Sequence, residues 1–148
     1  MEGGALKVDI VGGGDVTSLK YLQILQMHAH WGSTSGKGSE HTMDGVEYDA
    51  ELHIVHYNAK YGDPSVAVDK PDGLAVLGMF IKTGASNPEI EKICKHLSSV
   101  SIKDMSVSME HSSIDPTKLL PSNKTFFTYP GSLTTPPLFE SVTWLVFK

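Results

Sequence analysis

Cysteine, long apolar runs and an excess of positive charge are all missing from this 148-residue sequence. Cys94 is the single cysteine, so no disulfide bond can form within the chain. The longest nearly unbroken apolar stretch runs from Leu74 to Ile81 and is far too short to cross a bilayer. The 17 acidic residues outnumber the 12 basic ones and no basic stripe is present, which argues against nucleic-acid binding.

The start of the sequence also lacks a secretory signal, because Met1 to Gly4 contain no basic segment followed by an apolar stretch. Together with the lone cysteine, which suits a reducing compartment, this favours a cytoplasmic protein. The composition, 40% hydrophobic and 20% charged, is that of one soluble globular domain. A chain of this length can bury about 70% of the surface that its unfolded form exposes, so we expect a hydrophobic core.

Alternating apolar and polar residues predict a fold dominated by β-strands. The predicted strands cover residues 6–10, 21–31, 46–57, 74–82 and 141–147, and turn residues separate them. One helix is predicted after the N-cap residue Asn87, with an apolar stripe of Ile90, Ile93, Cys94 and Leu97. The predicted fold class is α+β but mainly β, a single domain on a large twisted, mostly antiparallel sheet with few short helices.

Two short stretches that contain histidine carry most of the functional information. Alternate side chains of a strand share a face, so His28 and His30 point the same way, and His53 can join them from a neighbouring strand. Three imidazoles converging from rigid strands match the protein ligands of a catalytic zinc site with a fourth position open for water. Gln26 and Glu51 lie two residues before ligands, where each could accept a hydrogen bond from the outer N–H of a ligand histidine.

A purely structural interpretation competes with the metal site. Two histidines in an H-x-H pair alone are more often hydrogen-bonded sheet residues than ligands, and only the third histidine and the polar neighbours favour a metal. His41 and His56 are predicted to be buried structural residues, with Tyr129 hydrogen-bonding near His41.

Six separate motifs, in order along the chain, resemble those of the alpha-class carbonic anhydrases. They are residues 26–32 (QMHAHWG), 39–44 (SEHTMD), 51–58 (ELHIVHYN), 74–78 (LAVLG), 129–137 (YPGSLTTPP) and 141–144 (SVTW). The similarity extends from about Gly3 to Phe147 and so covers essentially the whole chain.

The resemblance implies a zinc enzyme that reversibly hydrates carbon dioxide to bicarbonate and a proton and is blocked by sulfonamides. His28, His30 and His53 would hold Zn²⁺, and zinc-bound hydroxide would attack carbon dioxide. Thr134 would accept a hydrogen bond from that hydroxide and donate one to Glu40, which orients the nucleophile. Taken alone, Glu40 reads as a solvated loop acid and Thr134 as a turn residue.

The resemblance also implies a site for carbon dioxide and bicarbonate, the expected small-molecule partners. Thr135 would contact bicarbonate, and an apolar wall would receive carbon dioxide. The residues of this wall are Val55, Val76, Leu133, Val142 and Trp144. Each of them, taken singly, is better explained by core packing, and only their shared motif context favours a substrate surface.

Domains of this family usually extend further at both ends, so residues 1–148 are expected to form a partial domain. The upstream part usually carries the histidine that shuttles protons to solvent. Two alternative functions follow, namely a carbonic-anhydrase-related binding domain with weak or no turnover, and a truncated fragment. A sheet cut at both ends would expose strand edges, which adds self-association to the expected interactions.

Overall fold

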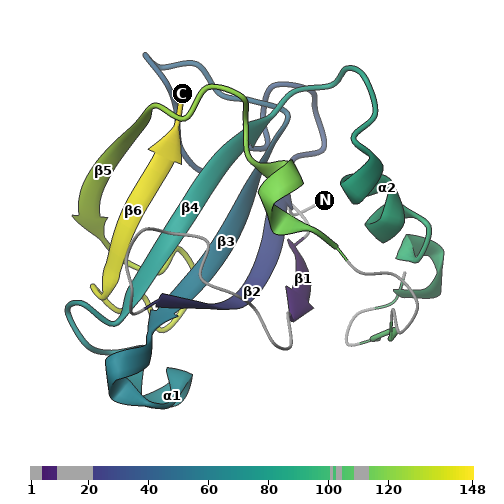
Figure 1. Ribbon diagram of the computed structural model, residues 1–148. Helices are drawn as coiled ribbons and strands as arrows, with labels where there is room; N and C mark the ends of the chain where they lie inside the picture. Colours follow the sequence, from purple (N-terminus) through teal and green to yellow (C-terminus); the bar gives the residue numbers. More distant parts are fainter. Residues whose placement is uncertain (1–4, 10–21, 101, 103–104, 109–113) are drawn as a thin grey trace. The chain divides into compact units, whose positions relative to one another are not determined.

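A computed structural model describes residues 5–9, 22–100, 102, 105–108 and 114–148 (Figure 1). The chain divides into two compact units. The sheet unit comprises residues 1–82 and 123–148, and the helical unit comprises residues 83–122. All candidate site residues belong to the sheet unit.

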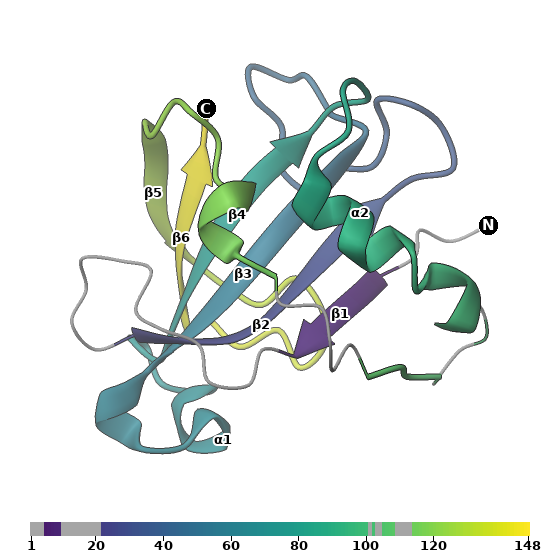
Figure 2. The ribbon, with the colours of Figure 1, turned by 45° about the vertical axis from the view of Figure 1, so that its right-hand side comes forward.

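Within the described residues, six strands form one twisted sheet in the order β1-β2-β3-β4-β6-β5 (Figure 1; Figure 2). The strands are β1 (Ala5–Asp9), β2 (Leu22–Trp31), β3 (Ala50–Asn58), β4 (Leu74–Ile81), β5 (Phe126–Gly131) and β6 (Val142–Phe147). All neighbouring strands are antiparallel except β4 and β6, which run parallel. The mainly-β fold class with mostly antiparallel pairing is thereby confirmed.

Side-chain alternation gives the sheet two faces, and both bury apolar residues. Because Val55 pairs with Val76 and Val76 pairs with Trp144, these side chains share one face. They belong to an apolar cluster, which consists of Val55, Leu74, Val76, Val142, Trp144 and Val146. The opposite face buries Met27, Leu52, Ile54, Leu77 and Met79. Burial of one such side chain contributes roughly 1.5–3 kcal/mol, so the central strands form the core of this unit.

Helices are short in both units. In the sheet unit, the 3₁₀ turn η1 (Ala59–Tyr61) and the helix α1 (Pro64–Ala67) follow β3. The helical unit contains α2 (Pro88–Cys94), η2 (Leu97–Val100) and η3 (Pro116–Leu119). No helix in the described part of the chain is long and apolar enough to cross a membrane.

Helix α2 begins as predicted but does not bury the predicted stripe. The Asn87 side chain accepts a hydrogen bond from the Glu89 N–H at 2.8 Å, as an N-cap residue should. Cys94 is exposed, so its predicted place in a buried stripe is wrong. The physical reason is that α2 ends at Cys94, and the next residue of the stripe, Leu97, begins a separate 3₁₀ turn.

Strand β3 begins four residues later than the sequence pattern predicts. Met43 and Val46 pair with each other across a tight turn, in which Asp44 and Gly45 have φ values of 52° and 77°. This turn takes up the residues before Ala50, where the strand begins.

Strand β5, which was not predicted, lies at one edge of the sheet. Pro130 lies within it, and an edge strand tolerates the missing N–H because one side of the strand needs no partner. Its side chains are largely exposed, with Phe127 at 51%. The Lys148 ammonium lies 4.3 Å from the centre of the Phe127 ring and partly covers it. Self-association through this edge stays a prediction.

Candidate metal centre

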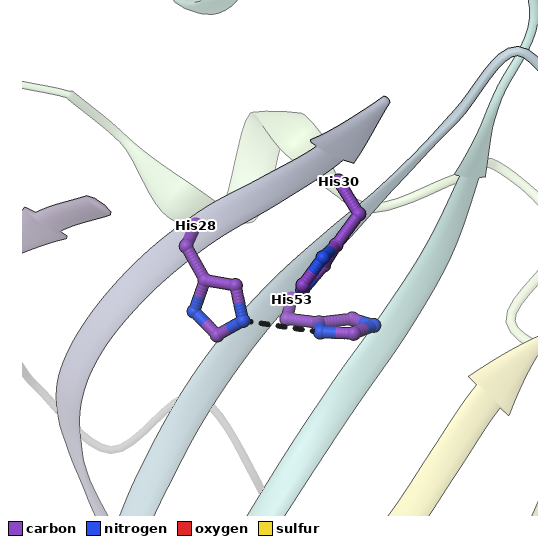
Figure 3. Close-up of side chains that lie close together, drawn as sticks. All are labelled: His28, His30 and His53. Carbon is purple, nitrogen blue, oxygen red and sulfur yellow. Dashed lines mark hydrogen bonds between the residues drawn. The ribbon is translucent and has the colours of Figure 1, made fainter. Parts of the chain in front are cut away.

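Three histidine side chains meet on the sheet face that carries the apolar cluster (Figure 3). His28 of β2 pairs directly with His53 of β3, and His30 follows two residues later on the same face of β2. The ring centres lie 5.0 Å apart for His28 and His30, 5.1 Å for His28 and His53, and 4.9 Å for His30 and His53. The structure thus brings together the three histidines that alternation along the strands predicted to share one face.

The distances between their nitrogens suit a common metal ion. One nitrogen from each of His28, His30 and His53 lies within 4.8 Å of the other two. His28 Nε2 and His53 Nδ1 are 3.2 Å apart. Zn–N bonds of about 2.0–2.1 Å at tetrahedral angles would place two ligand nitrogens about 3.3–3.4 Å apart. Without the metal, a 3.2 Å separation is a hydrogen bond, and a metal ion would replace its proton.

A fully buried carboxylate fixes the orientation of His53. Glu51 Oε1 accepts hydrogen bonds from His53 Nε2–H at 2.7 Å and from His41 Nδ1–H at 2.6 Å. Glu51 Oε2 accepts from the backbone N–H groups of Glu40 at 2.9 Å and of His41 at 2.8 Å. Burial alone would raise the pKa of Glu51, but these hydrogen bonds outweigh it and hold that pKa well below its ordinary value. With the proton of His53 on Nε2, the Nδ1 lone pair faces the other two histidines.

A second cluster of donor atoms, formed by His41, Glu51 and His53, does not fit a metal. Its nitrogen–oxygen distances of 2.6 and 2.7 Å are hydrogen-bond lengths. Two ligands of one tetrahedral zinc ion would lie about 3.3 Å apart instead. The cluster is therefore the hydrogen-bonded support of the three-histidine site.

His30 offers a buried nitrogen that lacks a hydrogen bond. In the described part of the chain, His30 Nε2 has no hydrogen-bond partner, although Glu40 Oε2 lies 3.4 Å away in a poor direction for one. Burial lowers the pKa of His30 and outweighs the opposing charge of Glu40, so the ring is neutral near pH 7. A neutral imidazole with an unused buried nitrogen is what a metal ligand requires. Three imidazole donors also suit zinc, so these residues fit the ion.

Gln26 lies on the same face of β2, and its role stays a prediction. Its Oε1 atom is buried and has no hydrogen-bond partner among the described residues. A buried acceptor beside His28 is available for the outer N–H of that ring, as the sequence analysis expected.

Glu40 and Thr134 are not joined in this structure. Glu40 Oε2 lies 3.4 Å from His30 Nε2 and 3.9 Å from His53 Nδ1, so its carboxylate faces these two histidine nitrogens. Thr134 is exposed in the loop after β5, and no hydrogen bond joins these two described side chains. The Thr135 carbonyl accepts the Leu138 N–H at 3.0 Å within the same loop. The proposed roles of Thr134, Thr135 and Glu40 stay predictions.

The predicted apolar wall lies beside the histidines. Val55, Val76, Val142 and Trp144 are buried in the apolar cluster, and Leu133 packs against it. The Trp144 ring centre is 4.8 Å from that of His53, so the cluster reaches the third histidine. The Trp144 Nε1–H donates to the Ser132 carbonyl at 3.1 Å and ties the wall to the loop that bears Thr134.

Two supporting features were missed by sequence reasoning. The His41 side chain binds Glu51, whereas the sequence predicted only a Tyr129 hydrogen bond near His41, which the structure also contains. Gly78 pairs with His53, and a Cβ there would lie 3.2 Å from Glu51 Oε1. A glycine inside an otherwise apolar strand is the available signal for such a close approach.

The fold and the site together define a class of protein. The site is a group of three histidines that could hold a metal ion, on the face of a mainly antiparallel sheet, with a buried carboxylate behind His53 and an apolar cluster beside it. The sequence model of the family described as eukaryotic-type carbonic anhydrase matches residues 5–148. The chain belongs to this family, and membership supports carbon dioxide hydration as its general activity.

Proposed function

We propose that this chain catalyses the zinc-dependent, reversible hydration of carbon dioxide to bicarbonate and a proton. The observation that carries the proposal is the convergence of His28, His30 and His53 beside an apolar cluster in a chain of this family. A linear apolar substrate needs a dry surface next to the metal and few polar contacts.

The three histidines would hold the ion through Nε2 of His28, Nε2 of His30 and Nδ1 of His53. When bound, zinc supplies the Lewis acidity that makes water a nucleophile near neutral pH. Glu51 keeps the proton of His53 on Nε2, away from the ion, and its negative charge increases the basicity of that ligand.

The apolar wall would receive the substrate. Val76, Val142 and Trp144 are 2%, 2% and 3% exposed, so this role requires neighbouring side chains to move and uncover part of their surface. Trp144 lies against His53, which places this surface next to the ligands. Carbon dioxide held there would be close to the nucleophile, and proximity lowers the entropic part of the barrier.

Thr134 would orient the attacking water. We propose that its hydroxyl donates a hydrogen bond to Glu40 and accepts one from the water, which aims a lone pair at carbon dioxide. This role requires the Glu40 carboxylate to turn from the ligand nitrogens toward the loop that bears Thr134. Thr135 would contact the bicarbonate product.

Two substitutions test the proposal when zinc content and carbon dioxide hydration are measured on the same samples. We expect His53→Ala to lose both tightly bound zinc and turnover, because it removes one ligand. The matched control, His96→Ala in the helical unit, should change neither. Undiminished zinc content in His53→Ala would show that the ligand assignment is wrong.

Thr134→Ala should keep its zinc but lose about 100-fold in hydration rate, because the nucleophile is no longer oriented. Thr143→Ala, an exposed threonine on β6, is the matched control and should retain the parental rate. Parental turnover in Thr134→Ala would contradict the role of its hydroxyl.

Zinc binding without turnover is the second candidate function, and the position of Glu40 favours it. Its carboxylate lies close to two ligand nitrogens, where it could take the place of water on the ion. The cobalt-substituted protein discriminates the two functions, because its visible spectrum changes with the ligand set. A spectrum altered by Glu40→Gln together with no turnover in the parent would support this alternative.

A further inference from the structure

A chain of hydrogen bonds runs from the edge strand β5 to His53. Tyr129 Oη lies 2.5 Å from His41 Nε2, and His41 Nδ1 lies 2.6 Å from Glu51 Oε1. The same Glu51 oxygen lies 2.7 Å from His53 Nε2. The chain begins at a side chain that is 40% exposed and ends at one that is 1% exposed.

The direction of each hydrogen bond follows from Glu51. An ionised carboxylate only accepts, so His41 Nδ1 and His53 Nε2 must both carry protons. In a neutral ring this leaves His41 Nε2 as an acceptor, and Tyr129 O–H must be its donor. Burial, followed by the negative charges of Glu51 and Glu40, raises the pKa of Tyr129, so the hydroxyl keeps its proton.

Glu51 has no spare acceptor capacity with which to adjust. It accepts four hydrogen bonds, two on each oxygen, which matches the roughly four lone-pair sites of a carboxylate. Gly78 lies against its Oε1 atom, and the His41 ring packs at 4.8 Å from the Trp144 ring. A movement of His41 must therefore move Glu51, and a movement of Glu51 must turn His53.

We propose that Tyr129 and His41 are positioning residues of the metal centre, which act through Glu51 to fix the ring orientation and tautomer of His53. The inference rests on the proposed function only in taking His53 as a metal ligand. It assigns a role in metal retention to Tyr129, whose hydroxyl hydrogen-bonds His41 and not one of the three proposed ligands. The residue that hydrogen-bonds a ligand directly, here Glu51, typically contributes 10–100-fold to metal affinity, and His41 and Tyr129 act through it.

Four variants test the proposal through the rate at which zinc passes to a chelator in excess. His41→Leu removes both side-chain hydrogen bonds and should release zinc at least about 10-fold faster than the parent. His41→Asn keeps a donor at the Nδ1 position and loses the contact with Tyr129, so it should accelerate release only a few-fold. Tyr129→Phe should match His41→Asn. Tyr57→Phe is the control, because it removes a tyrosine hydroxyl that hydrogen-bonds Gln23 at 2.8 Å elsewhere on the sheet.

The double variant His41→Asn with Tyr129→Phe shows whether Tyr129 acts through His41. It should release zinc no faster than His41→Asn alone, since residues that act in series are not additive. Additive effects would overturn the serial arrangement. Parental release rates in both His41→Leu and Tyr129→Phe would overturn the proposal as a whole.

A measurement on the metal-free protein keeps this test separate from the proposed function. Imidazole ¹⁵N resonances report which nitrogen carries the proton, and His53 should be in the Nε2–H form in the parent and in Tyr57→Phe. His41→Leu should show a mixture of tautomers, and Tyr129→Phe a smaller shift in the same direction. If the protein binds no zinc, the proposed function fails, and this spectrum still decides the positioning role. Tyr129→Phe removes only one oxygen atom. An unchanged His53 signal in this variant would contradict the positioning role of Tyr129.

Discussion

At the scale of single residues, Glu51 and His30 prepare the site for a metal in opposite ways. Glu51 is kept ionised by four N–H donors, and its charge faces His53. His30 is kept neutral because burial lowers its pKa. The site therefore presents a neutral imidazole at His30 and a negative charge behind His53, which favours a divalent cation over a proton.

The pH dependence of zinc binding follows from the pKa of His30. Zinc competes with protons only below the pKa of each ligand, and the pKa of His30 lies below its ordinary value of 6.5. We expect zinc affinity to change little from pH 8 to about 6.5 on account of His30 and to fall below that value. Chelator competition between pH 5 and pH 8 measures this profile.

Glu40→Gln provides the sign test, because the charge of Glu40 raises the pKa of His30 against the effect of burial. Without that charge the pKa of His30 drops further, so the loss of zinc affinity should begin at a lower pH. A shift toward higher pH in Glu40→Gln would contradict this account of His30.

At the scale of elements, β3 provides the central strand of the site. Glu51, His53 and Val55 alternate along one face of it, so a buried acid, a candidate ligand and a residue of the apolar cluster come from five consecutive positions. Strand β2 adds His28 and His30 on one side, and β4 leaves room with Gly78 on the other.

Gly78→Ala should weaken zinc binding. The added methyl group would lie 3.2 Å from Glu51 Oε1, which four hydrogen bonds prevent from moving away. Faster release of zinc to a chelator measures the effect, and urea unfolding of the metal-free protein reports stability separately. Gly36→Ala is the comparison. Alanine at a φ of +72° costs stability, but its added Cβ would have no neighbour within 4 Å. Equal zinc release from Gly78→Ala and the parent would show that the Glu51 side chain can move in spite of these contacts.

The period of two along the strands explains what the sequence could predict. It placed His28, His30, Glu51 and His53 correctly because alternation fixes which side chains share a face. The apolar run of β4 is likewise buried from Leu74 to Met79, as a strand covered on both faces should be.

Tertiary context explains what the sequence could not predict. Strand β5 was missed because Pro130 normally breaks a strand and is tolerated here only at the sheet edge. The position of the Glu40 carboxylate beside the histidines could not be predicted because Glu40 lies in a loop, where no periodicity fixes the side chain. Cys94 was misplaced because the stripe pattern does not reveal where a helix ends.

At the scale of the whole molecule, the expected cytoplasmic location, the partial domain and the self-association stay predictions. Among the described residues, the edge strand β5 offers a surface for pairing with another copy, because its Phe126 and Phe127 are 45% and 51% exposed. We expect the sedimentation coefficient of the parent to rise with concentration. Phe127→Lys should abolish this rise, since a charged side chain discourages edge pairing. Val46→Lys, at a residue 56% exposed in the turn before β3, should leave it unchanged. A parent that sediments as a monomer at all concentrations would contradict the prediction.

The most direct test of the central claim is to measure zinc content and carbon dioxide hydration rate on one purified sample of these 148 residues. We expect one zinc ion per chain and turnover that an aromatic sulfonamide blocks. Zinc without turnover would contradict the catalytic assignment and leave a metal-binding protein. A soluble, folded sample that takes up no zinc would contradict the metal centre itself.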